Sequence, residues 1–168
     1  DEWRAGVPSL VEYCFLANES VKRQISCENA GIISTKAGTF DNCLRLSMKI
    51  SGLDNGLAYR GGNKTYYFAE GVGIVRTENE YCGGLRIAVY ELSSYEGVGK
   101  GYMPFEDGMF RRYDAVNLND GYVGAAEYNY VADEDGDIII FSDRTGIREL
   151  PPVITRYDTI QGEIIEDD

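Results

Sequence analysis

The sequence predicts a mainly β protein built on an antiparallel, curved sheet, arranged as a meander or as a half-barrel or sandwich, with little helix. Residues that favour strands are plentiful, among them 13 Tyr and 6 Phe in 168 residues. The 20 Gly and other turn-forming residues recur about every ten residues, a spacing typical of short strands joined by tight turns. Apolar and polar residues alternate along most segments, whereas apolar residues at helical spacing are scarce.

Each predicted strand is bounded by turn-forming residues. The clearest one covers residues 40–51, because Leu44 and Leu46 fall on one face while Arg45 and Ser47 fall on the other. The predicted strands, in order, cover residues 10–16, 21–27, 40–51, 64–69, 73–78, 85–95, 109–117, 121–131, 137–142 and 153–160.

Three segments differ from the half-buried strands described above. Residues 138–141 are apolar at every position, which is expected of a strand at the centre of a sheet. Residues 3–13 are the only helical candidate, and Pro8 weakens it because proline disrupts a helix interior. Residues 153–160 follow two prolines and are predicted to form a last edge strand.

Glycines at positions 97, 99 and 101 mark the best internal boundary of the chain. The sequence therefore predicts a β lobe over residues 1–98, followed over residues 99–160 by a second β lobe or by a continuation of the same sheet. Residues 161–168 are predicted to form an acidic tail, because four of the last six residues are acids.

The charge of the chain bounds its partners and its chemistry. With 16 basic and 28 acidic residues, the formal net charge is −12. Such an excess of negative charge repels phosphate backbones, so no nucleic-acid partner is predicted. No apolar run approaches the roughly 18 residues of a membrane span, so no transmembrane segment is predicted in this chain. The absence of histidine excludes Ser-His-Asp and Cys-His catalytic groups.

The four cysteines are Cys14, Cys27, Cys43 and Cys82. Their spacing matches no Cys-x-x-Cys metal or redox motif, so neither a metal nor a cofactor is predicted. An even count permits disulfides, and buried free thiols are the alternative. Cys43 falls on the polar face of its predicted strand, which makes it a candidate for pairing with a cysteine on a neighbouring strand.

A cluster of acids around Gly136 has two interpretations. Asp133, Asp135 and Asp137 place carboxylates at alternate positions, as in the first half of an EF-hand calcium loop. The twelfth position counted from Asp133 is Arg144, however, and an arginine cannot bind calcium. A hairpin turn is therefore predicted, with a weak surface calcium site as the alternative.

Three segments resemble those of a known group of domains. Residues 37–44 contain Ala-Gly-Thr-Phe, residues 66–76 contain Tyr-Tyr-x-x-x-Gly-Val-Gly-x-Val, and residues 90–95 contain a Glu-Leu strand. In this order they resemble a widespread group of bacterial exported and lipoprotein-like domains of uncharacterised function. Residues 102–108 resemble the Pro- and Gly-containing opening of such domains, although here the opening follows the closing strand. The resemblance covers roughly half of the chain.

The resemblance implies an antiparallel β architecture at the cell envelope, and it assigns no catalytic residues. It includes Gly71-Val72-Gly73, which the residues themselves identify as a bulge or turn between two strands. A phosphate-binding loop would need a following helix, whereas residues 74–77 are strand-like.

Aromatic residues supply the candidate binding site. Tyr122, Tyr128 and Tyr130 share one parity on a single predicted strand and so face the same way. Such a row could line a concave ligand surface, because tyrosine combines a large apolar ring with a hydroxyl group. The alternative is the thin outer layer of a small sheet.

These observations predict a non-enzymatic cell-envelope or extracellular module that binds a ligand or an envelope protein. Two other classes stay open. One is a glycan hydrolase that uses carboxylates alone, which requires a cleft with two close acids, one of raised pKa. The other is a purely structural spacer domain, which requires no concave pocket.

Overall fold

The computed structural model describes residues 10–16, 19–51, 53–54, 57–58, 63–81, 86–118, 121, 123–145, 153–158 and 163–166. Within these ranges every regular element is a strand, which confirms the mainly β prediction, and no helix of the described part is long and apolar enough to cross a membrane. The strands are β1 (Leu10–Leu16), β2 (Glu19–Thr35), β3 (Gly38–Ser51), β4 (Leu53–Asp54), β5 (Leu57–Ala58), β6 (Lys64–Ala69), β7 (Gly73–Tyr81), β8 (Arg86–Glu96), β9 (Phe110–Asn117), β10 (Val123–Ala132), β11 (Ile138–Thr145), β12 (Val153–Asp158) and β13 (Glu163–Glu166).

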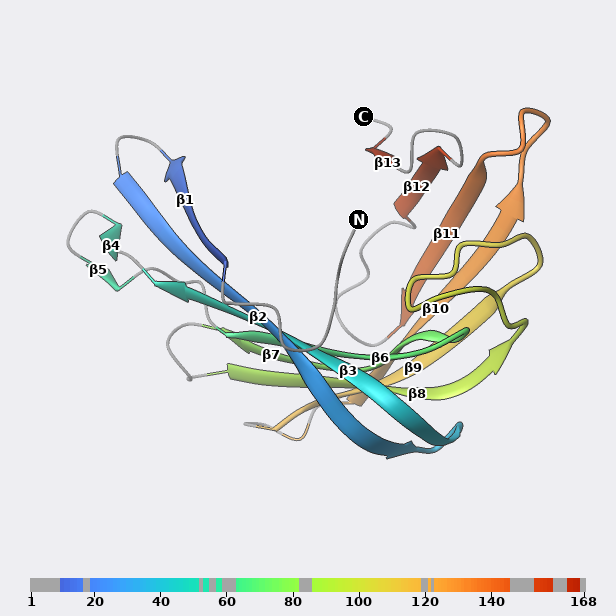
Figure 1. The fold of residues 1–168 in the computed structure, drawn as a ribbon, viewed down its shortest axis with the longest axis horizontal. Helices are drawn as coiled ribbons and strands as arrows, with labels where there is room; N and C mark the ends of the chain where they lie inside the picture. The colour runs from blue at the N-terminus through green and yellow to red at the C-terminus, as the bar shows by residue number, and fades with distance from the viewer. Residues whose placement is uncertain are drawn as a thin grey trace.

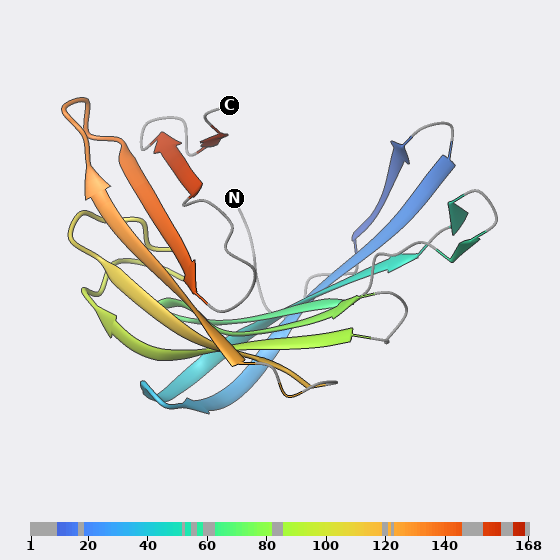
Figure 2. The same cartoon turned by 180° about the vertical axis from the view of Figure 1, so that it is seen from behind.

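Eleven strands form one antiparallel sheet in the order β1-β2-β3-β6-β7-β8-β9-β10-β11-β12-β13. Strands that follow one another along the chain are therefore neighbours in the sheet, which is the pattern of a meander. The short strands β4 and β5 form a separate hairpin. Among the described strands none joins β1 to β13, so the sheet is open. Figures 1 and 2 show that the first and the last strands rise on the same side of the central strands.

β8 and β9 pair directly across the glycine-rich stretch that the sequence marks as a boundary. Their ladder runs from Ala88 opposite Asn117 to Glu96 opposite Phe110. The strands on both sides of residues 97–109 therefore belong to one sheet. Of the two arrangements predicted for the second half of the chain, this pairing corresponds to a continuation of the same sheet.

The loop of residues 97–109 is fastened to the turn between β6 and β7. The N–H of Gly99 donates to the carbonyl oxygen of Gly71 at 2.9 Å, and the N–H of Gly71 donates to the carbonyl oxygen of Gly101 at 2.6 Å. Gly71 has a φ of +76°, and a Cβ atom there would lie 2.7 Å from Cγ1 of Val98. Both the backbone angle and the close approach require glycine, and the turn predicted at this position is confirmed.

β2 and β3 form a longer hairpin than the sequence predicts. The register of this hairpin shifts between Asn29 and Gly31 and again between Gly31 and Ile33. Such bulges bend a strand and increase its twist. The tip of the hairpin reaches β8, where the N–H of Ala37 donates to the carbonyl oxygen of Leu92 at 3.2 Å.

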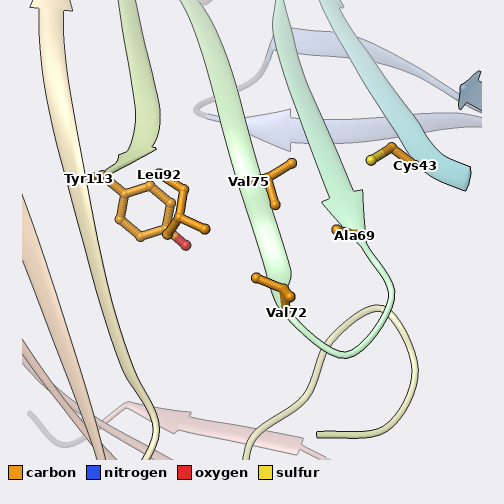
Figure 3. Close-up of a cluster of buried hydrophobic side chains, with 6 residues drawn as sticks. All are labelled: Cys43, Ala69, Val72, Val75, Leu92 and Tyr113. Carbon is orange, nitrogen blue, oxygen red and sulfur yellow. The ribbon is translucent and has the colours of Figure 1, made fainter. Parts of the chain in front are cut away.

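A buried cluster at this tip forms the main core. Figure 3 shows its six members on neighbouring strands and on the β6–β7 turn: Cys43, Ala69, Val72, Val75, Leu92 and Tyr113. Partly buried side chains of the hairpin tip, including Ile33, Ala37 and Phe40, pack against this cluster. The tip therefore covers apolar residues of β6–β9 that an open sheet would leave in water, and their burial stabilises the fold.

Cys43 is buried and free, so its predicted place on a polar face was wrong. Alternation along β3 does place the side chains of Cys43 and Leu44 on opposite faces of the strand, but the folded hairpin tip buries both faces at this point. The Cys43 thiol donates to the carbonyl oxygen of Phe40 at 3.3 Å. Cys27 is also buried and free. The disulfide state of Cys14 and Cys82 lies outside the described residues.

The C-terminal strands differ from the prediction in two ways. β12 pairs with β13 as well as with β11, so it is not the edge of the sheet. Residues Glu163–Glu166, which the sequence assigns to the acidic tail, form β13, because Ile164 and Ile165 favour an extended strand. In β11, Phe141 is 42% exposed, so the apolar run is not buried on both faces as expected.

The turn between β10 and β11 is the predicted hairpin turn. The carboxylate oxygen Oδ1 of Asp133 accepts hydrogen bonds from the N–H groups of Asp135 at 2.9 Å and Asp137 at 3.0 Å. Gly136 adopts a φ of +87°, which glycine tolerates without strain. The Asp133 carboxylate thus stabilises the turn through hydrogen bonds within it.

Candidate functional site

One face of strands β6–β10 carries a hollow of about 320 Å³, a size suited to a small organic ligand. We refer to this hollow as the tyrosine cavity. No acidic or basic side chain belongs to its described lining. The lining residues are Tyr66, Ile74, Thr77, Asn79, Tyr90, Tyr113, Tyr128 and Tyr130.

Strand pairing explains why residues so far apart in the chain share one face. Tyr66 lies opposite Thr77, and Thr77 lies opposite Tyr90. Directly opposite residues in an antiparallel ladder place their side chains on the same face. β9 and β10 continue the row through Tyr113 and Tyr128, whose rings meet edge to face with 5.7 Å between centroids. The meander therefore builds the cavity from five consecutive strands.

Tyr113 is the most buried of the lining tyrosines, with 8% of its surface exposed. Its hydroxyl reaches across β8 and donates to the carbonyl oxygen of Ile74 at 2.8 Å. Burial raises the pKa of Tyr113, and it raises the pKa of Tyr66 and of Tyr130 in the same direction. These hydroxyls therefore stay protonated at neutral pH, and a neutral hydroxyl both donates and accepts hydrogen bonds.

Arg111 lies beside the cavity on β9, and only 2% of it is exposed. Its guanidinium bonds to main-chain carbonyls instead of a carboxylate: Nε donates to Val72 at 2.8 Å, and the terminal nitrogens donate to Glu96, Gly97 and Phe110 at 2.6, 3.2 and 2.7 Å. Burial lowers the pKa of Arg111, but an arginine in a protein keeps its proton. The side chain fastens the β6–β7 turn to the end of β8.

The charge of Arg111 acts on the tyrosines around it. Its Cζ atom lies 5.5 Å from the ring centroid of Tyr95. The same charge opposes the effect of burial on Tyr130, whose pKa is raised by burial and lowered by Arg111. A fixed positive charge therefore stands next to the tyrosine cavity, while its hydrogen-bond donors are directed at the backbone.

Asn79 contributes a buried polar atom without a hydrogen-bond partner among the described residues. Its side-chain oxygen Oδ1 is buried, and no described residue donates a hydrogen bond to it. Asn79 lines the cavity two residues from Thr77 on β7. An unpaired buried amide oxygen costs about 1–3 kcal/mol.

The opposite face of the same strands carries ion pairs. Nζ of Lys36 lies 2.5 Å from Oδ2 of Asp114, and Arg112 pairs with Glu127. We call this the ion-paired face. This face carries a second hollow of the molecule, of about 450 Å³. Three of these four side chains, Lys36, Arg112 and Asp114, help to line it. The hydrogen bond from Lys36 is the main reason why the pKa of Asp114 is lowered.

A third hollow, of about 90 Å³, lies near Cys27 and is almost wholly apolar. Tyr102 and Met103 from the 97–109 loop help to line it, and the Tyr102 hydroxyl donates to the carbonyl oxygen of Asn42 at 3.0 Å. Burial raises the pKa of the Cys27 thiol, which keeps it protonated and poorly nucleophilic at neutral pH. The volume of this hollow has room for about three water molecules.

The structure brings together two of the three tyrosines that the sequence singles out. Tyr128 and Tyr130 line the tyrosine cavity, whereas Tyr122 lies outside the described residues. The sequence pattern does not predict the lining residues on the other strands, among them Tyr66 and Tyr90. Parity within one strand cannot reveal them, because their shared face depends on the register between strands.

Comparison with family models, with curated proteins and with solved structures finds no match to this chain. The described residues hold no group of three or more acidic or thiol side chains placed to bind a metal ion.

Proposed function

We propose that this protein is a non-enzymatic module of the cell envelope or the extracellular space that binds a ligand in the tyrosine cavity. The observation that carries the proposal is the convergence of five tyrosines with Thr77 and Asn79 on one face. Apolar rings combined with a few polar groups are typical of ligand sites. The cellular location is supported by the resemblance of residues 37–44, 66–76 and 90–95 to exported bacterial domains.

The two other classes receive less support from the geometry. A hydrolase that uses carboxylates needs an acid of raised pKa in its cleft, whereas the described lining of the tyrosine cavity has no carboxylate and the pKa of Asp114 on the other face is lowered. A spacer domain needs no hollow, so the presence of a cavity lined by five tyrosines favours a binding function over a spacer function.

The proposal is tested by nuclear magnetic resonance of the ¹⁵N-labelled protein with a panel of small probes: phenol, methyl β-glucopyranoside, choline, benzoate and prolinamide. We expect at least one probe, at millimolar concentration, to shift the amide resonances of Thr77, Asn79 and Tyr90. The resonances of Val123 and Ala125, which line the hollow on the ion-paired face, should stay in place. If no probe moves the cavity resonances, the proposal is wrong.

Two neighbouring positions on β8 provide a matched pair of variants. Tyr90 lines the cavity, and Glu91 points to the other face because side chains alternate along a strand. The Tyr90→Ala variant should lose the probe-induced shifts, whereas the Glu91→Ala variant should keep them. Equal shifts in both variants would place the probe somewhere other than the cavity.

A further inference from the structure

The charge around the tyrosine cavity selects for a neutral ligand. The described lining has no ionisable carboxylate, ammonium or guanidinium group, and burial keeps the hydroxyls of Tyr66, Tyr113 and Tyr130 protonated. A cation would meet the fixed positive charge of the buried Arg111, whose partners are backbone carbonyls. A cation would therefore not gain the full attraction that aromatic faces otherwise offer.

An anion is disfavoured for a different reason. The guanidinium of Arg111 directs its hydrogens at four carbonyl oxygens and at the sulfur of Met109, so it cannot also form the forked pair by which arginine binds carboxylate or phosphate. At longer range, the net charge of −12 opposes the approach of an anion. A neutral ligand escapes both effects.

The lining also combines two kinds of surface. Tyrosine rings offer apolar faces with a partial negative charge, on which C–H groups with a partial positive charge pack well. Thr77, Asn79 and the tyrosine hydroxyls add hydrogen-bonding groups around these faces. A ligand that complements this lining has a ring with C–H groups on its faces and hydroxyl groups around its edge. A pyranose sugar has this structure.

The hydroxyl groups of the lining narrow this choice further. Those of Thr77 and of the tyrosines can both donate and accept hydrogen bonds. A sugar hydroxyl can do the same and so matches them, whereas an apolar ring of similar size would offer them no partner.

We infer that the tyrosine cavity binds a neutral saccharide of one or two rings. This inference rests on the proposed function, since it names the ligand class of the same site. The size limit follows from the volume of about 320 Å³, which lies at the lower end of the range for small-molecule sites.

The test compares glycosides that differ at one charged substituent. Methyl β-glucopyranoside is neutral, the methyl glycoside of glucuronic acid has a carboxylate in place of the C6 hydroxymethyl group, and that of glucosamine has an ammonium in place of the C2 hydroxyl. Cellobiose and maltose serve as two-ring probes, and phenol serves as a ring without sugar hydroxyls. Binding is followed through the amide shifts of Thr77 and Asn79. We expect the neutral sugars to bind at least about tenfold more tightly than either charged one. Equal or tighter binding of a charged glycoside would overturn the inference.

The outcomes separate this inference from the proposed function. If phenol or another non-sugar probe shifts the cavity resonances while no sugar does, the saccharide inference fails and the proposed function stands. If no probe of any class shifts them, both fail. Shifts caused by neutral sugars at Thr77 and Asn79 support both.

Variants at adjacent positions of β7 sharpen the result. Asn79→Leu replaces a polar side chain of the cavity lining, whereas Glu78→Leu introduces the same residue on the opposite face. We expect Asn79→Leu to lower the affinity for the neutral sugar about tenfold and Glu78→Leu to leave it unchanged. Should Asn79→Leu not fold, Tyr66→Phe, which removes one hydroxyl and keeps the ring, must weaken sugar binding more than phenol binding. Loss of both in parallel would contradict the inference.

Discussion

The two faces of strands β7–β10 differ in chemistry although they are made by the same residues in alternation. On one face, neutral hydroxyls and rings surround the tyrosine cavity, and the charged Arg111 beside it is held by backbone carbonyls. On the ion-paired face, Lys36 and Arg112 are matched by Asp114 and Glu127 near the surface. The ion pairs of one face are exposed to water, whereas neutral hydrogen-bonding groups line a hollow on the other.

This difference indicates where each face obtains its stability. Exposed ion pairs contribute little, because water and salt screen them. Buried hydrogen bonds matter more, since each group left without a partner is penalised. Substitutions at successive positions of one strand should therefore have very different effects.

The largest difference is expected between Arg111→Met and Arg112→Met. Removing Arg111 leaves the carbonyls of Val72, Glu96 and Gly97 without their donor, so we expect a loss of about 3 kcal/mol or more in the free energy of unfolding. Removing Arg112 breaks an exposed pair and should cost at most about 1 kcal/mol. Denaturant unfolding followed by circular dichroism measures both, and similar losses would show that the two faces do not differ as described.

Next in size is the effect of Tyr128→Ala and Tyr130→Ala on binding. Each removes a ring from the cavity lining, so the affinity for methyl β-glucopyranoside should fall at least about tenfold. The loss of binding free energy should exceed the loss of unfolding free energy, which thermal melts report. Asn129→Ala, on the exposed position between them, is the control. Equal losses of affinity and stability would reduce these tyrosines to a structural role.

A smaller effect is expected from alkaline pH through Tyr113. Its pKa is raised in the folded protein, so above about pH 10 the unfolded chain loses this proton while the folded protein retains it, and stability falls as pH rises. Tyr113→Phe should cost about 1 kcal/mol at neutral pH, through the lost bond to Ile74. Its unfolding free energy should then decline less steeply with pH than that of the wild type. Parallel curves would contradict this account.

The smallest effect is expected from Asp114→Asn on the ion-paired face. The lowered pKa of Asp114 means that its contribution is present above the unfolded pKa of about 3.9 and is lost as pH falls through the lower, folded value. We expect a slight drop in melting temperature at neutral pH that vanishes in high salt and in acid. Scanning calorimetry at low and high salt measures it. A drop that persists in high salt would refute the surface-pair description.

Much of the strand pattern was predictable, because the turn residues and the alternation that define it are local. β6 has the bounds that its sequence predicts, and the turns around Gly71 and Gly136 have the predicted form. The errors are tertiary in origin. Cys43 was assigned to a polar face because alternation cannot show that the hairpin tip folds over the sheet, and the length of β2 was missed because its bulges interrupt the alternation.

The candidate site was predictable only in part. Tyr128 and Tyr130 share one strand, so parity alone placed them together. Tyr66, Thr77 and Tyr90 join them through pairing between strands. The register of that pairing cannot be inferred from the pattern of any one strand. The unpaired oxygen of Asn79 and the carbonyl partners of Arg111 likewise exist only once distant segments have met.

By itself, the sequence determined the antiparallel β class, the positions of most strands and turns, the negative charge and the supply of tyrosines, because these depend on residue type and local spacing. The tertiary structure decided which tyrosines face one another, which arginine is buried and which face is left to ion pairs. The physical reason is that the register between strands and the fold-back of the β2–β3 hairpin arise from contacts between residues far apart in the chain.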